Sequence, residues 1–220
     1  MLYVVSFSYL LLPLAFFLSK SKRSEIIPVS LSVYGIICSA FIFFFYDIDR
    51  DIQKYFQTSY TFFEYFVFTL IFWINIKQKK VRRLIAVASA LFFVFQLFYL
   101  LSIKVKSLDT IPIGIETILI LTYIIYFFYE FSKDLRNFYI YNHYCFWISV
   151  GILIYLGGSF FFFILIEHLN KDQIAIFGNL TYLTEIVKNV LFTLAIFIYH
   201  RYRFENTKEK TSSVPYLDMI

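Results

Sequence analysis

Seven apolar segments, each close to the length of a membrane-spanning helix, follow one another along the chain. A helix needs about 20 apolar residues to cross a bilayer, and 60% of the 220 residues are hydrophobic, compared with about 45–50% in soluble domains. The segments run from Leu2 to Leu18, Ile27 to Tyr46, Ser59 to Ile76, Leu84 to Ile103, Ile111 to Phe131, Tyr144 to Ile166 and Ile174 to Tyr199. We therefore predict an all-α polytopic membrane protein that folds as a seven-transmembrane-helix bundle.

Loops rich in lysine and arginine alternate with loops that are poor in them. The first, third and fifth loops and the tail hold 14 of the 20 basic residues: Lys20, Lys22, Arg23, Lys77, Lys79, Lys80, Arg82, Arg83, Lys133, Arg136, Arg201, Arg203, Lys208 and Lys210. The other three loops hold five: Arg50, Lys54, Lys104, Lys106 and Lys171. Because cytoplasmic loops carry the excess of basic residues, we predict an N-terminus outside and a cytoplasmic C-terminus.

The predicted seven-helix domain occupies residues 1–203, and a cytoplasmic tail follows at 204–220. The tail is polar up to Ser213, so we expect it to be disordered. The first segment lacks a basic start and a cleavage pattern, and Lys20 and Lys22 follow it, so we interpret it as a retained helix rather than a signal peptide. The abundance of Phe, Ile, Lys and Tyr is typical of AT-rich prokaryotic genomes and favours a bacterial inner (cytoplasmic) membrane.

The sequence also argues against several functions. It contains no Gly-rich phosphate loop, HExxH or GxSxG motif, and its loops of about 5–15 residues are too short for a catalytic domain. We therefore expect no enzymatic activity and no cofactor. Cys38 and Cys145 lie at different predicted depths, and His143, His168 and His200 are far apart, so neither a disulfide nor a metal site is expected. The net charge of +5 suits anionic lipid at the inner loops, and we expect no nucleic-acid partner.

Polar residues inside the predicted spans are the candidates for function. Lys188 lies in the middle of the last span, where a charge costs roughly 2.5–3.5 kcal/mol on insertion scales unless it faces a partner or a cavity. By the predicted topology, further polar side chains fall at compatible depths, in the outer half or near the midplane. The candidate residues of a ligand cavity are Glu64, Gln96, Glu116, Glu185, Lys188 and Asn189.

Two interpretations of these residues remain open. Lys188 lies one helical turn after Glu185 and can pair with it, or it can reach Glu64 or Glu116 across the bundle. Such pairing can fix the packing of the helices, as polar contacts do in membranes. The same residues can instead line a polar cavity, open to the outside, that binds a small ligand or ion, and a proton relay is a further alternative.

The sixth segment contains a series of small residues. Gly151 and Gly158 are seven residues apart on one helical face, which favours close packing against a neighbouring helix. The adjacent pair Gly157 and Gly158 can alternatively act as a hinge at which this helix bends.

In these features the chain resembles the seven-helix membrane sensors of bacterial two-component systems, both those fused to histidine kinases and stand-alone proteins built in the same way. The resemblance covers nearly the whole chain to about Arg203. It rests on the outside N-terminus and on Glu64, Glu116, Phe146-Trp147, Gly151-Ile-Leu-Ile-Tyr155 and Lys188-Asn189. The kinase domain of that family is missing here, so the resemblance implies a separate cytoplasmic partner, such as a histidine kinase or another signalling protein.

We therefore expect a non-enzymatic sensor or receptor subunit that binds a small ligand in an outer-half cavity and signals to a cytoplasmic partner. A transporter of a small solute or ion that uses the same residues as a pathway is the alternative. A third hypothesis is a retinal-type photoreceptor with Lys188 as the Schiff base and Glu64 as the counter-ion. The match to microbial rhodopsins is poor, because their acidic residue lies four positions before the lysine and Glu185 lies three before it.

Overall fold

The computed structural model describes residues 2–19, 25–45, 50–102, 110–133, 140–165 and 169–212. Across these ranges the chain forms seven α-helices and one 3-10 turn and contains no strand, so the all-α prediction is confirmed. The elements are α1 (Leu2–Leu18), α2 (Ile26–Phe45), α3 (Arg50–Asn75), α4 (Lys79–Ser102), α5 (Thr110–Ser132), η1 (Ile140–Asn142), α6 (Tyr144–Leu165) and α7 (Lys171–Ser212).

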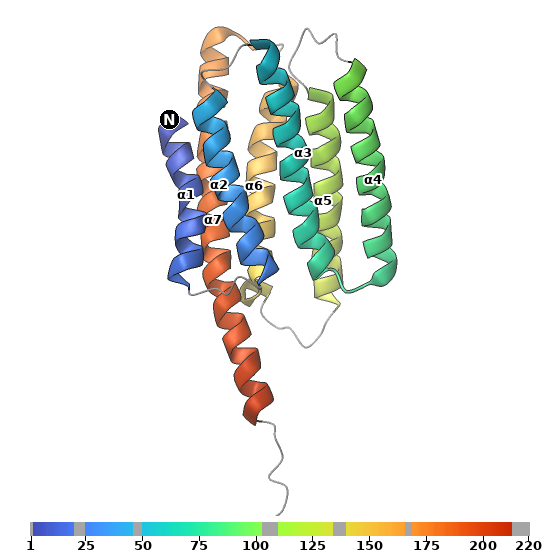
Figure 1. Ribbon diagram of the computed structural model, residues 1–220, viewed down its shortest axis with the longest axis vertical. Helices are drawn as coiled ribbons and strands as arrows, with labels where there is room; N and C mark the ends of the chain where they lie inside the picture. The colour runs from blue at the N-terminus through green and yellow to red at the C-terminus, as the bar shows by residue number, and fades with distance from the viewer. Residues whose placement is uncertain are drawn as a thin grey trace, which may run out of the picture.

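Six of the helices form a closed ring, and α4 packs on the outside of it (Figure 1). Around the ring, α1 packs against α2, α2 against α3, α3 against α5, α5 against α6, α6 against α7, and α7 against α1. Helix α4 packs mainly on α3. Every ring helix therefore has two neighbours, and the space they enclose is where polar groups from all six can meet.

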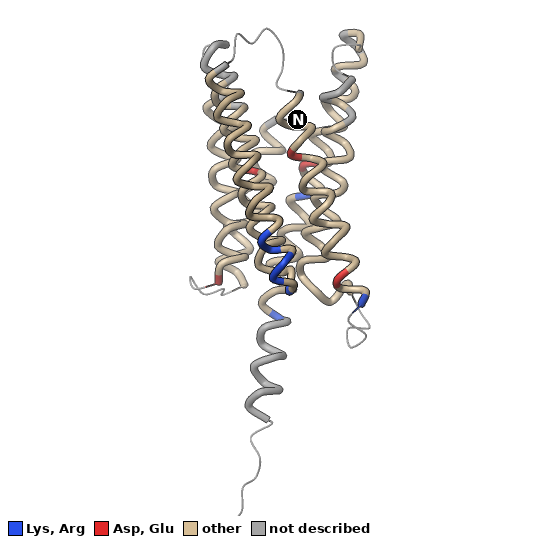
Figure 2. Tube along the Cα trace, turned by 90° about the vertical axis from the view of Figure 1, so that its right-hand side faces the viewer, with Lys and Arg blue, Asp and Glu red and all other residues tan. Residues whose placement is uncertain are grey.

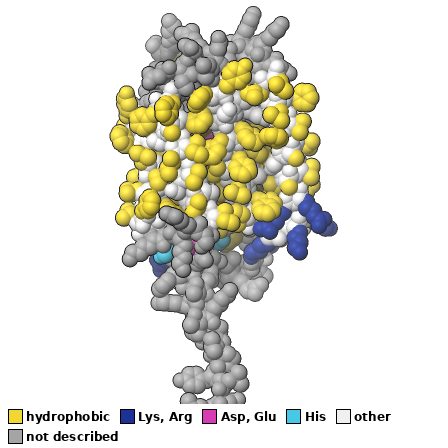
Figure 3. Space-filling model, in the orientation of Figure 1, with side chains coloured by type: hydrophobic (Ala, Val, Ile, Leu, Met, Phe, Trp, Pro, Cys, Tyr) yellow, Lys and Arg dark blue, Asp and Glu magenta, His cyan; other side chains and the backbone are white. Residues whose placement is uncertain are grey.

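The face of the bundle seen in Figure 3 is apolar over most of its described part, and large hydrophobic side chains are exposed on all seven described helices. Four helical segments are long and apolar enough to cross a membrane, namely Ile26–Phe44, Lys79–Leu101, Ile111–Ser132 and Ile176–Arg201. The apolar parts of α1 and α6 are shorter, and α3 begins with Arg50 and Asp51 and carries Glu64. A chain with four such helices and an apolar exterior has the character of a membrane protein.

Helix α1 approaches α2 closely at one point, which brings Tyr9 beside Tyr34. Pro13 lies inside α1, and because proline has no N–H it leaves the carbonyl of Tyr9 without its helical donor. Gly35 of α2 faces this carbonyl, and a Cβ atom at Gly35 would lie 2.5 Å from the Tyr9 oxygen. Only glycine allows this approach of the two helices. The approach brings the side chains of Tyr9 and Tyr34 into contact.

Helix α6 packs against α7 along two of the three glycines singled out in the sequence. A Cβ at Gly151 would lie 3.2 Å from the ring of Phe192, and one at Gly158 would lie 2.6 Å from Cγ2 of Thr184. A Cβ at Gly157 would meet nothing within 4 Å. Helix α6 continues through this pair without a break, so the geometry supports a packing role for Gly151 and Gly158.

The last helix, α7, continues to Ser212, and residues 213–220 lie outside the described part. The predicted end of the helical domain at residue 203 and the disorder predicted for residues 204–220 stay predictions. The helix extends past the ends of the other six (Figure 1). The segment 204–212 is polar, so its helical state continues a helix already nucleated within the bundle rather than depending on an apolar face of its own.

The end of the bundle from which α7 extends is also the basic end (Figure 2). There Glu130 of α5 accepts the backbone N–H groups of Lys77 and Gln78, each at 2.9 Å. Tyr144 of α6 donates to Oδ1 of Asn75 at 2.6 Å. These bonds attach the turn between α3 and α4 to α5, and the end of α3 to α6.

Candidate functional site

The ammonium group of Lys188 lies at the centre of the helix ring and has no exposed surface. Its Nζ donates to Oη of Tyr34 at 2.7 Å, to Oη of Tyr9 at 3.3 Å and to Oε1 of Glu64 at 3.3 Å. An ammonium group has three donor hydrogens, so these three acceptors satisfy it completely. The burial of Lys188 is therefore compensated by one opposite charge and two hydroxyl groups.

Glu64 of α3 receives hydrogen bonds from several helices. Its Oε1 accepts the hydroxyl of Tyr34 at 2.5 Å and that of Tyr60 at 3.4 Å, and its Oε2 accepts the hydroxyl of Tyr155 at 3.0 Å. Hydrogen bonds to a charged acceptor are about twice as strong as those between neutral groups. This carboxylate joins α2, α3 and α6 to the lysine of α7.

Aromatic rings enclose the lysine. Nζ of Lys188 lies 3.7 Å from the ring centroid of Tyr155, 5.2 Å from that of Tyr34 and 5.3 Å from that of Tyr9. Cations within about 6 Å of a ring centroid are attracted to the ring face, and the attraction is stronger when the cation is desolvated. At this site three tyrosine rings therefore surround the ammonium group of Lys188, and the carboxylate of Glu64 forms an ion pair with it.

Glu185 joins this cluster indirectly. The sequence left open whether Lys188 pairs with Glu185 or with an acid on another helix, and the ion pair in the described part of the structure is with Glu64. Glu185 instead accepts a hydrogen bond from the hydroxyl of Tyr9. The same hydroxyl accepts a hydrogen bond from Nζ of Lys188. Tyr9 therefore stands between the lysine and the second carboxylate.

Glu116 of α5 is buried near the same charges, with which it interacts electrostatically. Its Oε1 has no hydrogen-bond partner among the described residues, and neither has Oγ1 of the adjacent Thr117. One lysine thus faces three carboxyl groups: Glu64, Glu116 and Glu185. Three ionised carboxylates would outnumber the single ammonium group. Since an unpaired charge is costly in a low-dielectric interior, the cluster becomes neutral only if some of the carboxyl groups bind protons or if a cation binds beside them.

Two other candidate residues have different surroundings. Asn189 points toward α1, where its Nδ2 donates to Oγ of Ser8 at 2.8 Å, and its Oδ1 has no partner among the described residues. Gln96 of α4 donates to the backbone carbonyl of Thr58 at 3.2 Å and lines a groove between α3 and α4. The structure therefore separates Gln96 from the residues around Lys188.

Sequence reasoning did not assign a site role to the tyrosines, which provide most of the contacts around Lys188. The chain contains 19 tyrosines, and tyrosine commonly lies at protein and membrane interfaces without a site role, so a single one carries little information. The spacing of Tyr60 and Glu64, four residues apart in a helix, was one signal that could have indicated a polar face.

The structure gives no sign of a metal centre where it can be examined. Within the described ranges, no group of three or more His, Cys, Asp or Glu side chains could hold a metal ion. Cys38 and Cys145 are both buried and free. The ionisable groups of the described cluster around Lys188 are therefore one ammonium group, several phenols and three carboxyl groups.

Fold and site together define the class of this molecule as an all-helical protein that has four helices long and apolar enough to cross a membrane and a buried ionisable cluster. No family model, curated protein or solved structure matches the chain. Its function is therefore argued from the geometry of the cluster and of the helix that carries the lysine.

Proposed function

We propose that the protein is a membrane sensor or receptor subunit in which the Lys188 cluster is the switch and α7 carries the response. The observation behind the proposal is that the fully buried lysine belongs to α7, which among the described helices is the one that continues beyond the bundle, to Ser212. A change at Lys188 changes the contacts of α7 with α1, α2 and α3, to which the lysine is bonded. The same rigid helix reaches the basic end of the molecule.

The proposal includes seven spans with the N-terminus outside. The described basic side chains support this orientation, because Lys79, Lys80, Arg82, Arg83 and Lys133 belong to the end from which α7 extends. Cytoplasmic loops carry such an excess. The extended part of α7 then lies in the cytoplasm, where a histidine kinase or another signalling protein can bind it.

The stimulus in this proposal is a small molecule from outside or from within the membrane. Because Lys188 has no exposed surface, the ligand reaches the cluster only when the surrounding helices move apart. A ligand that binds the separated state more tightly shifts the population toward it. Gln96 lies apart from the cluster, so we place the entry among the ring helices α3, α5, α6 and α7.

Native mass spectrometry of the protein extracted gently from its own membrane tests the proposal. The full chain and a chain ending at Arg201 are compared, because the shorter chain keeps the bundle and lacks the extended end of α7. A sensor retains a soluble signalling protein at fixed stoichiometry in the full chain and loses it in the shorter one. If both chains carry only lipid, the sensor proposal is wrong.

Transport of a small solute or ion is a second candidate, and Glu116 is the observation that favours it. A carboxyl oxygen without a partner, close to a charged pair, can take up and release a proton or cation. Proteoliposomes with an imposed ion or proton gradient test this candidate. Flux that is present in the natural protein and lost in Glu116→Gln would favour transport over sensing.

A further inference from the structure

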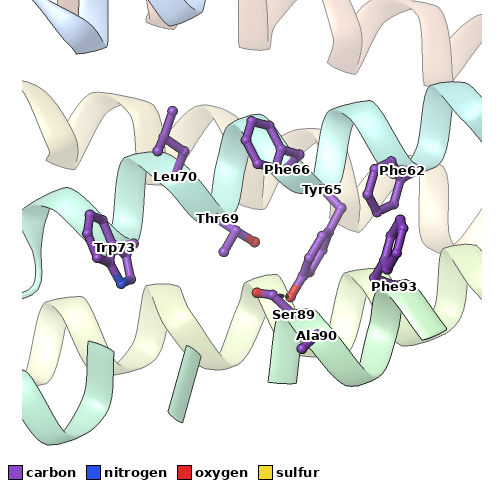
Figure 4. Close-up of a pocket in the computed structure, with 9 residues that line it drawn as sticks. All are labelled: Phe62, Tyr65, Phe66, Thr69, Leu70, Trp73, Ser89, Ala90 and Phe93. Atoms are coloured by element: carbon purple, nitrogen blue, oxygen red, sulfur yellow. Dashed lines mark hydrogen bonds between the residues drawn. The ribbon is translucent and has the colours of Figure 1, made fainter. Parts of the chain in front are cut away.

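A groove between α3 and α4 lies outside the buried cluster and opens on the exterior of the bundle (Figure 4). Its volume is about 350 Å³. Its wall is mainly aromatic and aliphatic, with Phe62, Phe66 and Trp73 from α3 and Ala90 and Phe93 from α4. Phe66 is 56% exposed and Trp73 is 42% exposed, so these rings form an open wall to which a chain-like apolar molecule can bind.

The length of the groove fits one leaflet of a bilayer. Phe62 and Trp73 lie about 16 Å apart along α3, at about 1.5 Å rise per residue. Half of the hydrocarbon core of a bilayer is about 15 Å thick. The groove can therefore receive one acyl chain over the depth of a single leaflet.

Basic side chains that the described structure does not pair with a carboxylate lie at the Trp73 end of the groove. The guanidinium of Arg82 lies 5.0 Å from the ring centroid of Trp73 and donates through Nη2 to the carbonyl of Ile74 at 2.9 Å. Its Nε is buried and has no partner among the described residues. Lys79, Lys80 and Arg83 are exposed nearby (Figure 3), and the structure pairs none of these side chains with a carboxylate within the described ranges.

The groove contains one further unsatisfied polar group. Oγ1 of Thr69 is buried in the wall and has no hydrogen-bond partner in the described part of the chain. Thr69 lies about one helical turn from Trp73, toward the membrane interior. Its hydroxyl therefore lies at the depth of the ester carbonyls of a lipid whose headgroup lies at the level of Trp73 and Arg82, and a small shift of the groove wall would let it donate to such a carbonyl.

We propose that the groove between α3 and α4 is a binding site for a phospholipid with an anionic headgroup. One acyl chain lies along Phe62, Phe66 and Phe93, and the phosphate accepts from Arg82, with Lys79 and Arg83 adding positive charge. Charge complementarity identifies the ligand as anionic lipid, because a zwitterionic lipid would leave this group of cations without compensation.

Competition for lipid in mixed micelles tests the proposal. The full-length protein is exchanged into detergent containing equal amounts of phosphatidylglycerol and phosphatidylcholine, and bound lipids are counted by native mass spectrometry. We expect phosphatidylglycerol to be preferred. Arg82→Gln should reduce this preference about fivefold, as expected for the loss of one basic residue beside anionic lipid.

Two further variants separate the groove from general surface charge. Lys133→Gln removes a basic residue at the same end but outside the groove, so it should leave the preference unchanged. Ala90→Trp fills the groove without changing charge and should reduce retention of both lipids. Equal retention of the two lipids by the natural protein, or equal effects of Arg82→Gln and Lys133→Gln, would overturn the proposal and leave only non-specific lipid around the bundle.

Discussion

At the scale of single residues, Lys188 and Glu64 depend on each other. Each is fully or almost fully buried, and each supplies the only opposite charge that the structure pairs with the other in the described part. The tyrosines contribute hydrogen bonds but no charge. Removing either partner therefore leaves the other buried without the opposite charge to which it is directly bonded.

A double-mutant cycle on this pair should show strong coupling. We expect Glu64→Gln and Lys188→Met each to lower the free energy of unfolding by roughly 3–5 kcal/mol. The double variant should lose clearly less than the sum, because neither member of the pair is left behind without the charge to which it was bonded. Denaturant titration in detergent micelles measures all three, with Thr122→Val on the exposed side of α5 as a control expected within about 0.5 kcal/mol. Additive losses would show that the two charges act independently.

His143, just before α6, predicts a specific dependence of stability on pH. Burial, and next the positive charge of Lys77, lower the pKa of its imidazole from 6.5 to about 4. The ring packs against Phe127, Phe131 and Tyr144, and its Nδ1 accepts the N–H of Cys145 at 3.2 Å. The neutral form is thus the one that fits the fold.

The sign of this dependence follows from the two states. Between about pH 6.5 and pH 4 the unfolded chain binds a proton at His143 that the folded chain does not, so stability falls as the pH is lowered through this window and levels off below it. His143→Phe keeps an aromatic ring and removes the titration. The difference in melting temperature between the natural protein and this variant should therefore change with pH between 6.5 and 4; a constant difference would contradict the assignment.

At the scale of helices, the glycines of α6 show what spacing alone can predict. The seven-residue interval between Gly151 and Gly158 indicated a packing face, and both glycines do face α7. Helix geometry places Gly157 about 100° around the axis from Gly158. The sequence could not tell which neighbouring helix each side meets, because the rotation of a helix about its axis depends on its neighbours.

Alanine substitutions at the two adjacent glycines should have opposite effects. Gly158→Ala places a methyl group 2.6 Å from Thr184, so it should weaken the contact between α6 and α7 and lower the melting temperature. Gly157→Ala meets nothing within 4 Å and replaces a flexible residue in a helix, which should be neutral or stabilising by up to about 1 kcal/mol. Thermal unfolding of both purified variants measures the contrast. If both are destabilised equally, α6 needs flexibility at this point, as a hinge would.

At the scale of the whole molecule, the all-helical fold and the bounds of most helices could be predicted from the sequence, because long apolar segments leave the chain few alternatives. The partner of Lys188 could not be predicted. Glu64 and Glu185 lay at compatible depths, and only the rotation and packing of α3 and α7 select one of them. Gln96 was grouped with the cluster for the same reason, since depth alone could not show that α4 packs outside the ring.

The orientation of the molecule in the membrane gives a direct prediction. With Cys38 and Cys145 replaced by alanine, single cysteines are introduced at Lys80, in the first turn of α4, and at Asn170, just before α7. In intact cells a membrane-impermeant maleimide should label Asn170→Cys and should label Lys80→Cys only after the membrane is permeabilised. The reverse pattern would place the N-terminus in the cytoplasm.

The length of α7 has a mechanical consequence. From Lys188 to Ser212 the helix measures about 36 Å, at about 1.5 Å rise per residue. If α7 behaves as a stiff lever with its pivot at Lys188, a tilt of about 5° displaces its far end by about 3 Å. A small rearrangement of the Lys188 ammonium group among its neighbours need not disturb the packing of the ring. At the far end of α7 it would nevertheless produce a displacement comparable to the length of a hydrogen bond.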